Sequence, residues 1–167
     1  GGPLRPSLRD MAAALGIVLT PTYGSTETSG GCVLDGTPLP GVIVTIDTPA
    51  SSAMQIDDVD AQAPGIIEVG GVTIALGYRG DPEATQRHFR TVDGRRVFRT
   101  SDLGRLRPDG ALEVLGRADD VVVINGINVA PDAVERVVQD LPDVESTAVV
   151  SIRPPDAEPW LAVFVQV

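Results

Sequence analysis

The residues with the clearest chemical potential lie together in the segment TPTYGSTETSGGCVLDG, residues 20–36. A hydroxyl such as that of Thr26 could donate a hydrogen bond to a phosphate oxygen. The Glu27 carboxylate could hold Mg²⁺, which prefers carboxylate, phosphate and water oxygens. Tyr23 offers an aromatic face to a purine base, and the glycines allow close backbone approach. Taken alone, the segment is slightly better explained as a Gly- and Ser-rich surface loop, because such loops are common.

The elements before this segment should position it. Pro6 suits the first turn of a helix over residues 6–15, whose apolar residues recur at helical spacing, and Gly16 can end that helix. The apolar run at 17–20 predicts a short buried strand that opens directly into the segment. In α/β sheets, ligand sites commonly lie at the carboxyl end of a strand.

Short strands separated by turns are predicted between residues 42 and 115. Asp81 is a good helix N-cap with Pro82 at the first helical position. Residues 49–65 are polar, acidic and flanked by proline, which favours an exposed loop or weak hairpin. The expected strands are 42–47, 65–71, 95–102, 103–110 and 111–116.

After Gly116 the pattern predicts a small α+β part. Gly126 should form a turn after a strand at 121–124, and the apolar stripe of 131–141 predicts a helix. Two further strands are expected at 146–152 and 160–167. A domain boundary near Arg117 would then separate a larger α/β part from this smaller one.

The composition is that of a globular protein, and it argues against a membrane span and against nucleic acid as the main partner. The chain has 167 residues, about one domain's worth, and is 43% hydrophobic, so a packed core is expected. No apolar run reaches the roughly 18–20 residues that span a bilayer. A net charge of -10 argues against nucleic acid as the main partner. The single cysteine, Cys32, excludes an internal disulfide and fits the reducing cytoplasm.

All 13 basic residues are arginine. The absence of lysine rules out, within this chain, any mechanism that needs one, including a P-loop or a Schiff base. The chain begins with Gly-Gly-Pro and ends in the apolar run WLAVFVQV. We therefore expect it to be a piece of a longer protein.

Two further blocks follow YGSTE and change the interpretation of that segment. They are FRTSDLGRLRPDG at 98–110 and GRADDVVVING at 116–126. In this order and spacing, the three blocks resemble the adenylate-forming ligases, a family of acyl-CoA synthetases, luciferases and adenylation domains of peptide synthetases. The resemblance extends over essentially the whole chain, including LGYRGDPEAT at 76–85. Within the family, residues 26–42 look most similar to one group of acyl-CoA ligases that acts in menaquinone synthesis.

The resemblance implies a function for the first block. Such enzymes activate a small carboxylic acid with ATP to an acyl-adenylate, and then transfer the acyl group to coenzyme A. Tyr23 would stack on adenine, Thr26 would contact the α-phosphate and Glu27 would bind Mg²⁺. Aligned donors and a metal would stabilise the charge that builds on phosphate oxygens. The seam between nucleotide and acyl group would be lined by Gly1, Gly2, Gly24 and Ser25.

The later blocks would supply further contacts. Asp102 would accept hydrogen bonds from the ribose hydroxyls, although an Asp at a strand end can also simply form a turn. Arg117 would reach the ribose or a phosphate, or else be a solvated surface arginine. Asp119 matches the hinge about which the small domain rotates between half-reactions. Gly126 would leave room for the pantetheine of CoA, and without the family argument it is equally well explained as a hairpin turn.

The implied fold is mixed α/β and α+β. Residues 1–116 would form the back part of the large domain, with a strand-rich, barrel-like subdomain. Residues 117–167 would form most of the small C-terminal lid domain, with the hinge near Asp119. We expect His88, Cys32 and Trp160 to have structural roles only.

The missing lysines are where the chain departs from the family. Family members carry one in an upstream phosphate loop and a catalytic one near the carboxyl terminus. The isolated chain should therefore be inactive. Three other interpretations stay open: an adenylation domain of a peptide synthetase, a non-catalytic nucleotide-binding module, and a plain mixed domain without a ligand.

Overall fold

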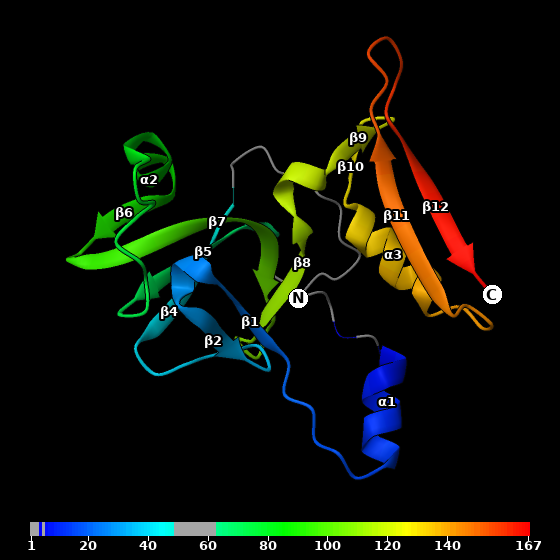
Figure 1. Ribbon diagram of the computed structural model, residues 1–167, viewed down its shortest axis with the longest axis horizontal. Coiled ribbons are helices and arrows are strands. Elements are labelled where there is room, and N and C mark those ends of the chain that lie inside the picture. The colour runs from blue at the N-terminus through cyan, green and yellow to red at the C-terminus, as the bar shows by residue number, and fades with distance from the viewer. Residues whose placement is uncertain (1–3, 5, 49–62) are drawn as a thin grey trace. The chain divides into compact units, whose positions relative to one another are not determined.

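The computed structural model describes residue 4 and residues 6–48 and 63–167, which divide into two compact units (Figure 1). One unit is Thr20–Val114. The other joins the chain's beginning, up to Leu19, with Leu115–Val167. Within the described part of the chain, no helix is both long and apolar enough to cross a membrane.

The first unit is built on an open five-stranded sheet. Its strand order is β4-β5-β7-β6, all antiparallel, with β8 also paired to β7. The mixed, strand-rich class predicted from the sequence is confirmed, and the sheet is open rather than closed into a barrel. The strands are β4 (Val42–Asp47), β5 (Gly65–Gly71), β6 (Phe89–Val92), β7 (Arg95–Leu106) and β8 (Leu112–Arg117), and the residues of β8 after Val114 belong to the second unit.

One prediction for this sheet was wrong. The strand expected at 95–102 and the first residues of the one expected at 103–110 form a single long strand, β7, which ends at Leu106. The pairing with β5 continues past the expected break, through Ile66 with Leu103 and Gly65 with Gly104. A register shift between Ile66 and Glu68 accommodates this continuation, so the chain needs no turn there.

The Gly-rich segment 20–36 forms a hairpin rather than a loop. Strands β1 (Thr22–Ser25) and β2 (Gly30–Leu34) pair antiparallel on either side of the short helix η1 (Thr26–Thr28), and β3 (Thr37–Pro38) pairs with β2. The strand predicted at 17–20 is not formed. No described strand pairs with those residues, and Val18 is 90% exposed.

The core of this unit lies where the hairpin meets the sheet. Its buried residues come from β2, β4, β5, β6, β7, β8 and the segment after β5: Cys32, Val33, Val42, Ile67, Val69, Ile74, Phe89, Phe98 and Leu112. Cys32 is fully buried, in agreement with a structural role. The core thus anchors both the hairpin and the strand that carries Asp102.

The helix α2 (Pro82–His88) starts as predicted. Asp81 is its N-cap, and its Oδ1 accepts a hydrogen bond from the Ala84 amide at 2.8 Å. At the other end, His88 Nδ1 lies 3.1 Å from the Arg99 carbonyl oxygen. His88 therefore links α2 to β7, which is the structural role expected for it. Of the loop predicted at 49–65, residues 49–62 lie outside the described part.

The second unit contains the remaining elements. Asn125 and Gly126 both have positive φ, 50° and 79°, and form the predicted turn of the β9-β10 hairpin. Helix α3 packs against β11, and β11 pairs antiparallel with β12. Trp160, for which only a structural role was expected, opens β12 and is 51% exposed, so it is not one of the buried core residues. The elements are α1 (Pro6–Ala14), η2 (Ala118–Asp120), β9 (Val122–Ile124), β10 (Ile127–Val129), α3 (Pro131–Gln139), β11 (Ser146–Ile152) and β12 (Trp160–Gln166).

Candidate functional site

The turn between β1 and β2 is held by Thr28. Its Oγ1 accepts a hydrogen bond from the Ser25 amide at 2.8 Å and lies 2.8 Å from the Gly30 carbonyl, to which it can donate. The Thr28 side chain is buried, whereas Thr26 is exposed and Glu27 partly buried. The turn thus has a fixed backbone that presents Thr26 and Glu27 outward.

Gly24 is required by the hairpin itself. The β1-β2 register shifts between Tyr23 and Gly24, and a Cβ on Gly24 would lie 2.0 Å from the Gly30 carbonyl oxygen. The glycine after Tyr23 therefore has a backbone reason, independent of any ligand.

Tyr23 and Asp102 are brought together although they are 79 residues apart. The Tyr23 hydroxyl donates to Asp102 Oδ2 at 2.8 Å. Burial, and then the neighbouring Asp102 charge, raise the pKa of Tyr23 far above its usual range, so the phenol stays a donor. The Asp102 amide donates to Thr100 Oγ1 at 3.0 Å, and that hydroxyl lies 2.9 Å from the Ile67 carbonyl. The backbone of Asp102 is therefore tied to Thr100, and its carboxylate is tied to Tyr23.

Glu27 is held by the segment that follows β5. Its Oε1 accepts a hydrogen bond from the Tyr78 hydroxyl at 2.8 Å, and its carbonyl accepts one from the Ala75 amide at 2.8 Å. Burial acts to raise the pKa of Glu27, but hydrogen bonds, that from Tyr78 foremost, outweigh it and lower the pKa. Burial and the Glu27 contact raise the pKa of Tyr78 to about 12. A carboxylate of this kind is a suitable magnesium ligand.

The donor set fits magnesium bound together with a nucleotide. Among the described residues no cluster of three His, Cys, Asp or Glu side chains could hold a metal by itself. Magnesium commonly binds through one or two carboxylates, with substrate phosphates and waters as its other ligands. Glu27 alone would then be enough, provided that phosphates occupy the neighbouring space.

The other predicted residues lie in the second unit or outside the description. Arg117 and Asp119 form an exposed ion pair at 3.4 Å, and Arg153 donates to the Asp119 and Val121 carbonyls at 3.0 and 3.1 Å. Gly126 is exposed at its hairpin turn. Gly1 and Gly2 lie outside the described residues. The first unit thus contains Tyr23, Gly24, Ser25, Thr26, Glu27 and Asp102, whereas Arg117, Asp119 and Gly126 belong to the second unit.

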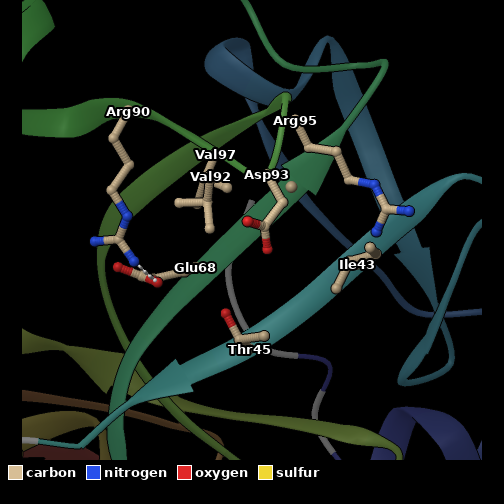
Figure 2. Close-up of a pocket in the computed structure, with 9 residues that line it drawn as sticks. Ile43, Thr45, Glu68, Arg90, Val92, Asp93, Arg95 and Val97 are labelled. Atoms are coloured by element: carbon tan, nitrogen blue, oxygen red, sulfur yellow. Dashed lines mark hydrogen bonds and ion pairs between the residues drawn. The ribbon is translucent and has the colours of Figure 1, made fainter.

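A hollow in the first unit lies away from these residues. It has a volume of about 240 Å³ and lies over β4, β5, β6 and β7, where Figure 2 shows Glu68 and Arg90 at one side and Asp93 and Arg95 at another. None of the candidate residues lines it. The candidate site is defined by side-chain contacts, and this hollow is a separate feature.

Tyr78 was not among the site residues predicted from the sequence. It lies within the LGYRGDPEAT block that contributed to the family resemblance, and it is one of only two tyrosines in the chain. Each of these tyrosines donates to a carboxylate of the candidate site. The scarcity of tyrosine, together with the position of both in recognised blocks, is the signal that could have found it.

Comparison with known sequences identifies relatives. A probable 2-succinylbenzoate–CoA ligase of Mycobacterium tuberculosis is 39% identical over an alignment of 155 residues, which covers 89% of this chain and 34% of that protein. The pyochelin synthetase PchF of Pseudomonas aeruginosa is 57% identical over 63 residues, 37% of this chain and 4% of that protein. No family model matches the chain.

Solved structures share the fold. ATP-bound MatB from Rhodopseudomonas palustris matches with a TM-score of 0.78 at 30% identity, over 99% of this chain and 34% of MatB. The o-succinylbenzoate–CoA synthetase MenE of Bacillus subtilis, in complex with ATP and a magnesium ion, matches with a TM-score of 0.77. That match covers 99% of this chain and 35% of MenE, and its 24% identity shows the fold alone.

Sequence and fold together place the chain in the adenylate-forming enzyme family. The resemblance stated from the three sequence blocks is thereby confirmed. The chain spans about a third of the length of the 2-succinylbenzoate–CoA ligase and of the solved structures that it matches.

Proposed function

We propose that the chain is part of an AMP-forming acid–CoA ligase, and specifically of an o-succinylbenzoate–CoA ligase of menaquinone synthesis. The observation that carries the specific proposal is the 39% identity to the probable 2-succinylbenzoate–CoA ligase over 89% of the chain. Contact between the Tyr23 hydroxyl and Asp102 supports the general reaction class, since it joins two predicted nucleotide contacts.

The first unit would bind the nucleotide. Asp102 would accept hydrogen bonds from the ribose hydroxyls, the Tyr23 ring would stack on adenine, and Thr26 would donate to the α-phosphate. Glu27 would hold Mg²⁺, which when bound would neutralise phosphate charge as the acyl-adenylate forms. The seam with the acyl group would be lined by Gly1, Gly2, Gly24 and Ser25.

The remaining roles belong to residues after Val114. Arg117 would contact the ribose or a phosphate, Asp119 would be the hinge, and Gly126 would leave room for the thiol arm of CoA. The division into a large-domain part, 1–116, and a lid part, 117–167, belongs to this proposal. So does a cytoplasmic location, which fits a chain whose single cysteine, Cys32, forms no internal disulfide.

Replacing Asp102 by asparagine tests the nucleotide site. Asp102→Asn keeps an oxygen acceptor for Tyr23 but removes the charge that strengthens hydrogen bonds from ribose hydroxyls. We expect the Kd for AMP, measured by calorimetry on the 167-residue chain, to rise about tenfold. Asp109→Asn is the matched control, because it removes a carboxylate charge from an exposed turn of the same unit. An unchanged Kd in Asp102→Asn would contradict the assignment.

ATP–pyrophosphate exchange tests the reaction. The protein encoded by the longer reading frame that contains this chain should exchange label only when o-succinylbenzoate is added, and should form its CoA thioester. The 167-residue chain alone should show no exchange, because it contains no lysine. Exchange by this chain alone would show that the lysines are dispensable. If the longer protein shows no exchange with o-succinylbenzoate, the proposed specific activity is refuted.

A peptide-synthetase adenylation domain is the second candidate. The match to PchF, 57% identity over 63 residues, favours it for that part of the chain. Such a domain would transfer its acyl group to the phosphopantetheine of a carrier protein instead of free CoA. The acceptor used in the second half-reaction therefore distinguishes a CoA ligase from a peptide-synthetase adenylation domain. AMP binding without any ATP–pyrophosphate exchange would instead indicate a non-catalytic nucleotide-binding module.

A further inference from the structure

The segment from Thr73 to Asp81, between β5 and α2, makes two separate contacts with Glu27. The Tyr78 hydroxyl donates to the carboxylate at 2.8 Å, and the Ala75 amide donates to the Glu27 carbonyl at 2.8 Å. One contact fixes the backbone of the residue and the other fixes the end of its side chain. Both come from the same short segment.

That segment is itself held in place. Arg96 donates from Nε to the Ala75 carbonyl at 2.7 Å, and its Nη2 donates to the Leu76 carbonyl. The Tyr78 amide donates to Thr85 Oγ1 at 2.9 Å. The Tyr78 hydroxyl is thus carried by a backbone that is tied to β7 and to α2.

The Tyr78 ring is also fixed by packing. Its centroid lies 6.0 Å from that of His88 and 5.4 Å from that of Phe89, both in edge-on arrangements, and Phe89 is buried in the core. Edge-on aromatic pairs at these separations are favourable. The hydroxyl therefore stands at a defined position above the turn that carries Glu27.

We propose that Tyr78 is a positioning residue that orients the Glu27 carboxylate for magnesium bound to a nucleotide phosphate. The inference rests on the proposed function, because it assumes that Glu27 is the metal ligand. A carboxylate offers about four lone-pair sites, so a hydrogen bond at Oε1 leaves acceptor capacity for a metal. Since a glutamate side chain rotates about several bonds, ordering it before the metal arrives strengthens binding.

The test compares two variants that each remove one hydrogen bond between the same segments. Tyr78→Phe keeps the ring and its packing but removes the donor to Glu27. Ser29→Ala removes the 2.8 Å hydrogen bond from the Ser29 hydroxyl to the Thr73 carbonyl and leaves the Glu27 carboxylate untouched. Calorimetry on the 167-residue chain would measure ATP affinity across a Mg²⁺ titration, and AMP affinity in the presence of a chelator.

Tyr78→Phe should raise the Mg²⁺ concentration for half-maximal ATP binding roughly five- to tenfold, with the metal-free AMP affinity unchanged. Ser29→Ala should behave as the wild type in both measurements. Equal Mg²⁺ dependence of Tyr78→Phe and the wild type would overturn the inference while leaving the proposed function standing. A wild-type chain whose ATP binding ignores Mg²⁺ would overturn both.

A second measurement examines orientation without a metal. Three-bond NMR couplings of the Glu27 side chain should report one rotamer in the wild type and in Ser29→Ala, and averaged rotamers in Tyr78→Phe. Averaging already present in the wild type would refute the positioning role. If Tyr78 orders the Glu27 side chain but ATP binding does not depend on Mg²⁺, then the proposed role of Glu27 as the metal ligand is wrong.

Discussion

Gly24→Ala should lower the free energy of unfolding by about 3 kcal/mol, at the upper end of the usual cost of adding a methyl group to packed structure. The added Cβ would lie 2.0 Å from the Gly30 carbonyl oxygen and 2.8 Å from the Gly31 Cα. These are backbone atoms of the paired strand, so no side chain can rotate away to make room. The hairpin would have to open at its irregular register between Tyr23 and Gly24. Denaturant unfolding followed by circular dichroism would measure the change.

Gly31→Ala is the matched control on the same hairpin. A Cβ there would meet the Thr22 side chain at 3.4 Å, which is ordinary van der Waals contact. We expect its stability to stay within about 0.5 kcal/mol of the wild type. If the two variants lose the same stability, the close approach of Gly24 to Gly30 is not what requires a glycine at that position.

This glycine shows how a sequence signal can have a structural cause. In the block YGSTE, Gly24 was predicted to line the seam between nucleotide and acyl group. The hairpin by itself already requires a glycine there, because the facing backbone leaves no room for a side chain. The presence of this glycine is therefore weaker evidence for a ligand than the presence of Asp102. The fold could form without the contact between Asp102 and Tyr23.

Local pattern predicted most elements and failed where pairing decided the outcome. The cap of α2 at Asp81 and the turn at Gly126 depend on nearby backbone, and both formed as predicted. The residues at 17–20 have strand propensity, but no described strand pairs with them. Conversely, β7 runs through an expected break because β5 continues to pair with it. Whether a segment has a partner strand, and how far the pairing extends, cannot be deduced from that segment alone.

The same limit explains what was found and what was missed at the candidate site. Tyr23 and Glu27 were candidates from their own chemistry, and the family resemblance, which carries long-range information, added Asp102 to them. Tyr78 acts on Glu27 across 51 residues through a hydrogen bond that no periodicity reveals. Its role could be seen only once the segment after β5 was placed beside the turn at 26–28.

Glu68 is a buried acid on the opposite face of β5 from the core residue Ile67. Its side chain is 5% exposed and pairs with Arg90 at 2.6 Å, as Figure 2 shows, while Arg99 Nε lies 3.8 Å from its other oxygen. That other oxygen, Oε1, accepts no hydrogen bond from the described residues. The carboxylate is thus compensated mainly by one arginine, whose own side chain is half exposed.

Arg90→Ala should therefore cost about 3 kcal/mol of unfolding free energy, because it leaves a buried carboxylate with a single, more distant cation. Arg107→Ala is the matched control: its pair with Asp109 at 3.2 Å is exposed on both sides, so the expected loss is below about 0.5 kcal/mol. Urea unfolding of both variants would measure the difference.

A double variant separates the buried charge from the packing of the arginine stem. When Arg90→Met and Glu68→Met are combined, the uncompensated carboxylate is gone, and apolar side chains of similar length fill the space beside Val92 and Val97 in the hollow. We expect the double variant to recover most of the stability that Arg90→Met alone loses, as replacement of a buried ion pair by apolar residues is often near neutral. Additive losses in the double variant would mean that Arg90 does not stabilise the sheet through Glu68. Recovery would show that the cost of losing Arg90 lies in the desolvated carboxylate that it leaves on β5.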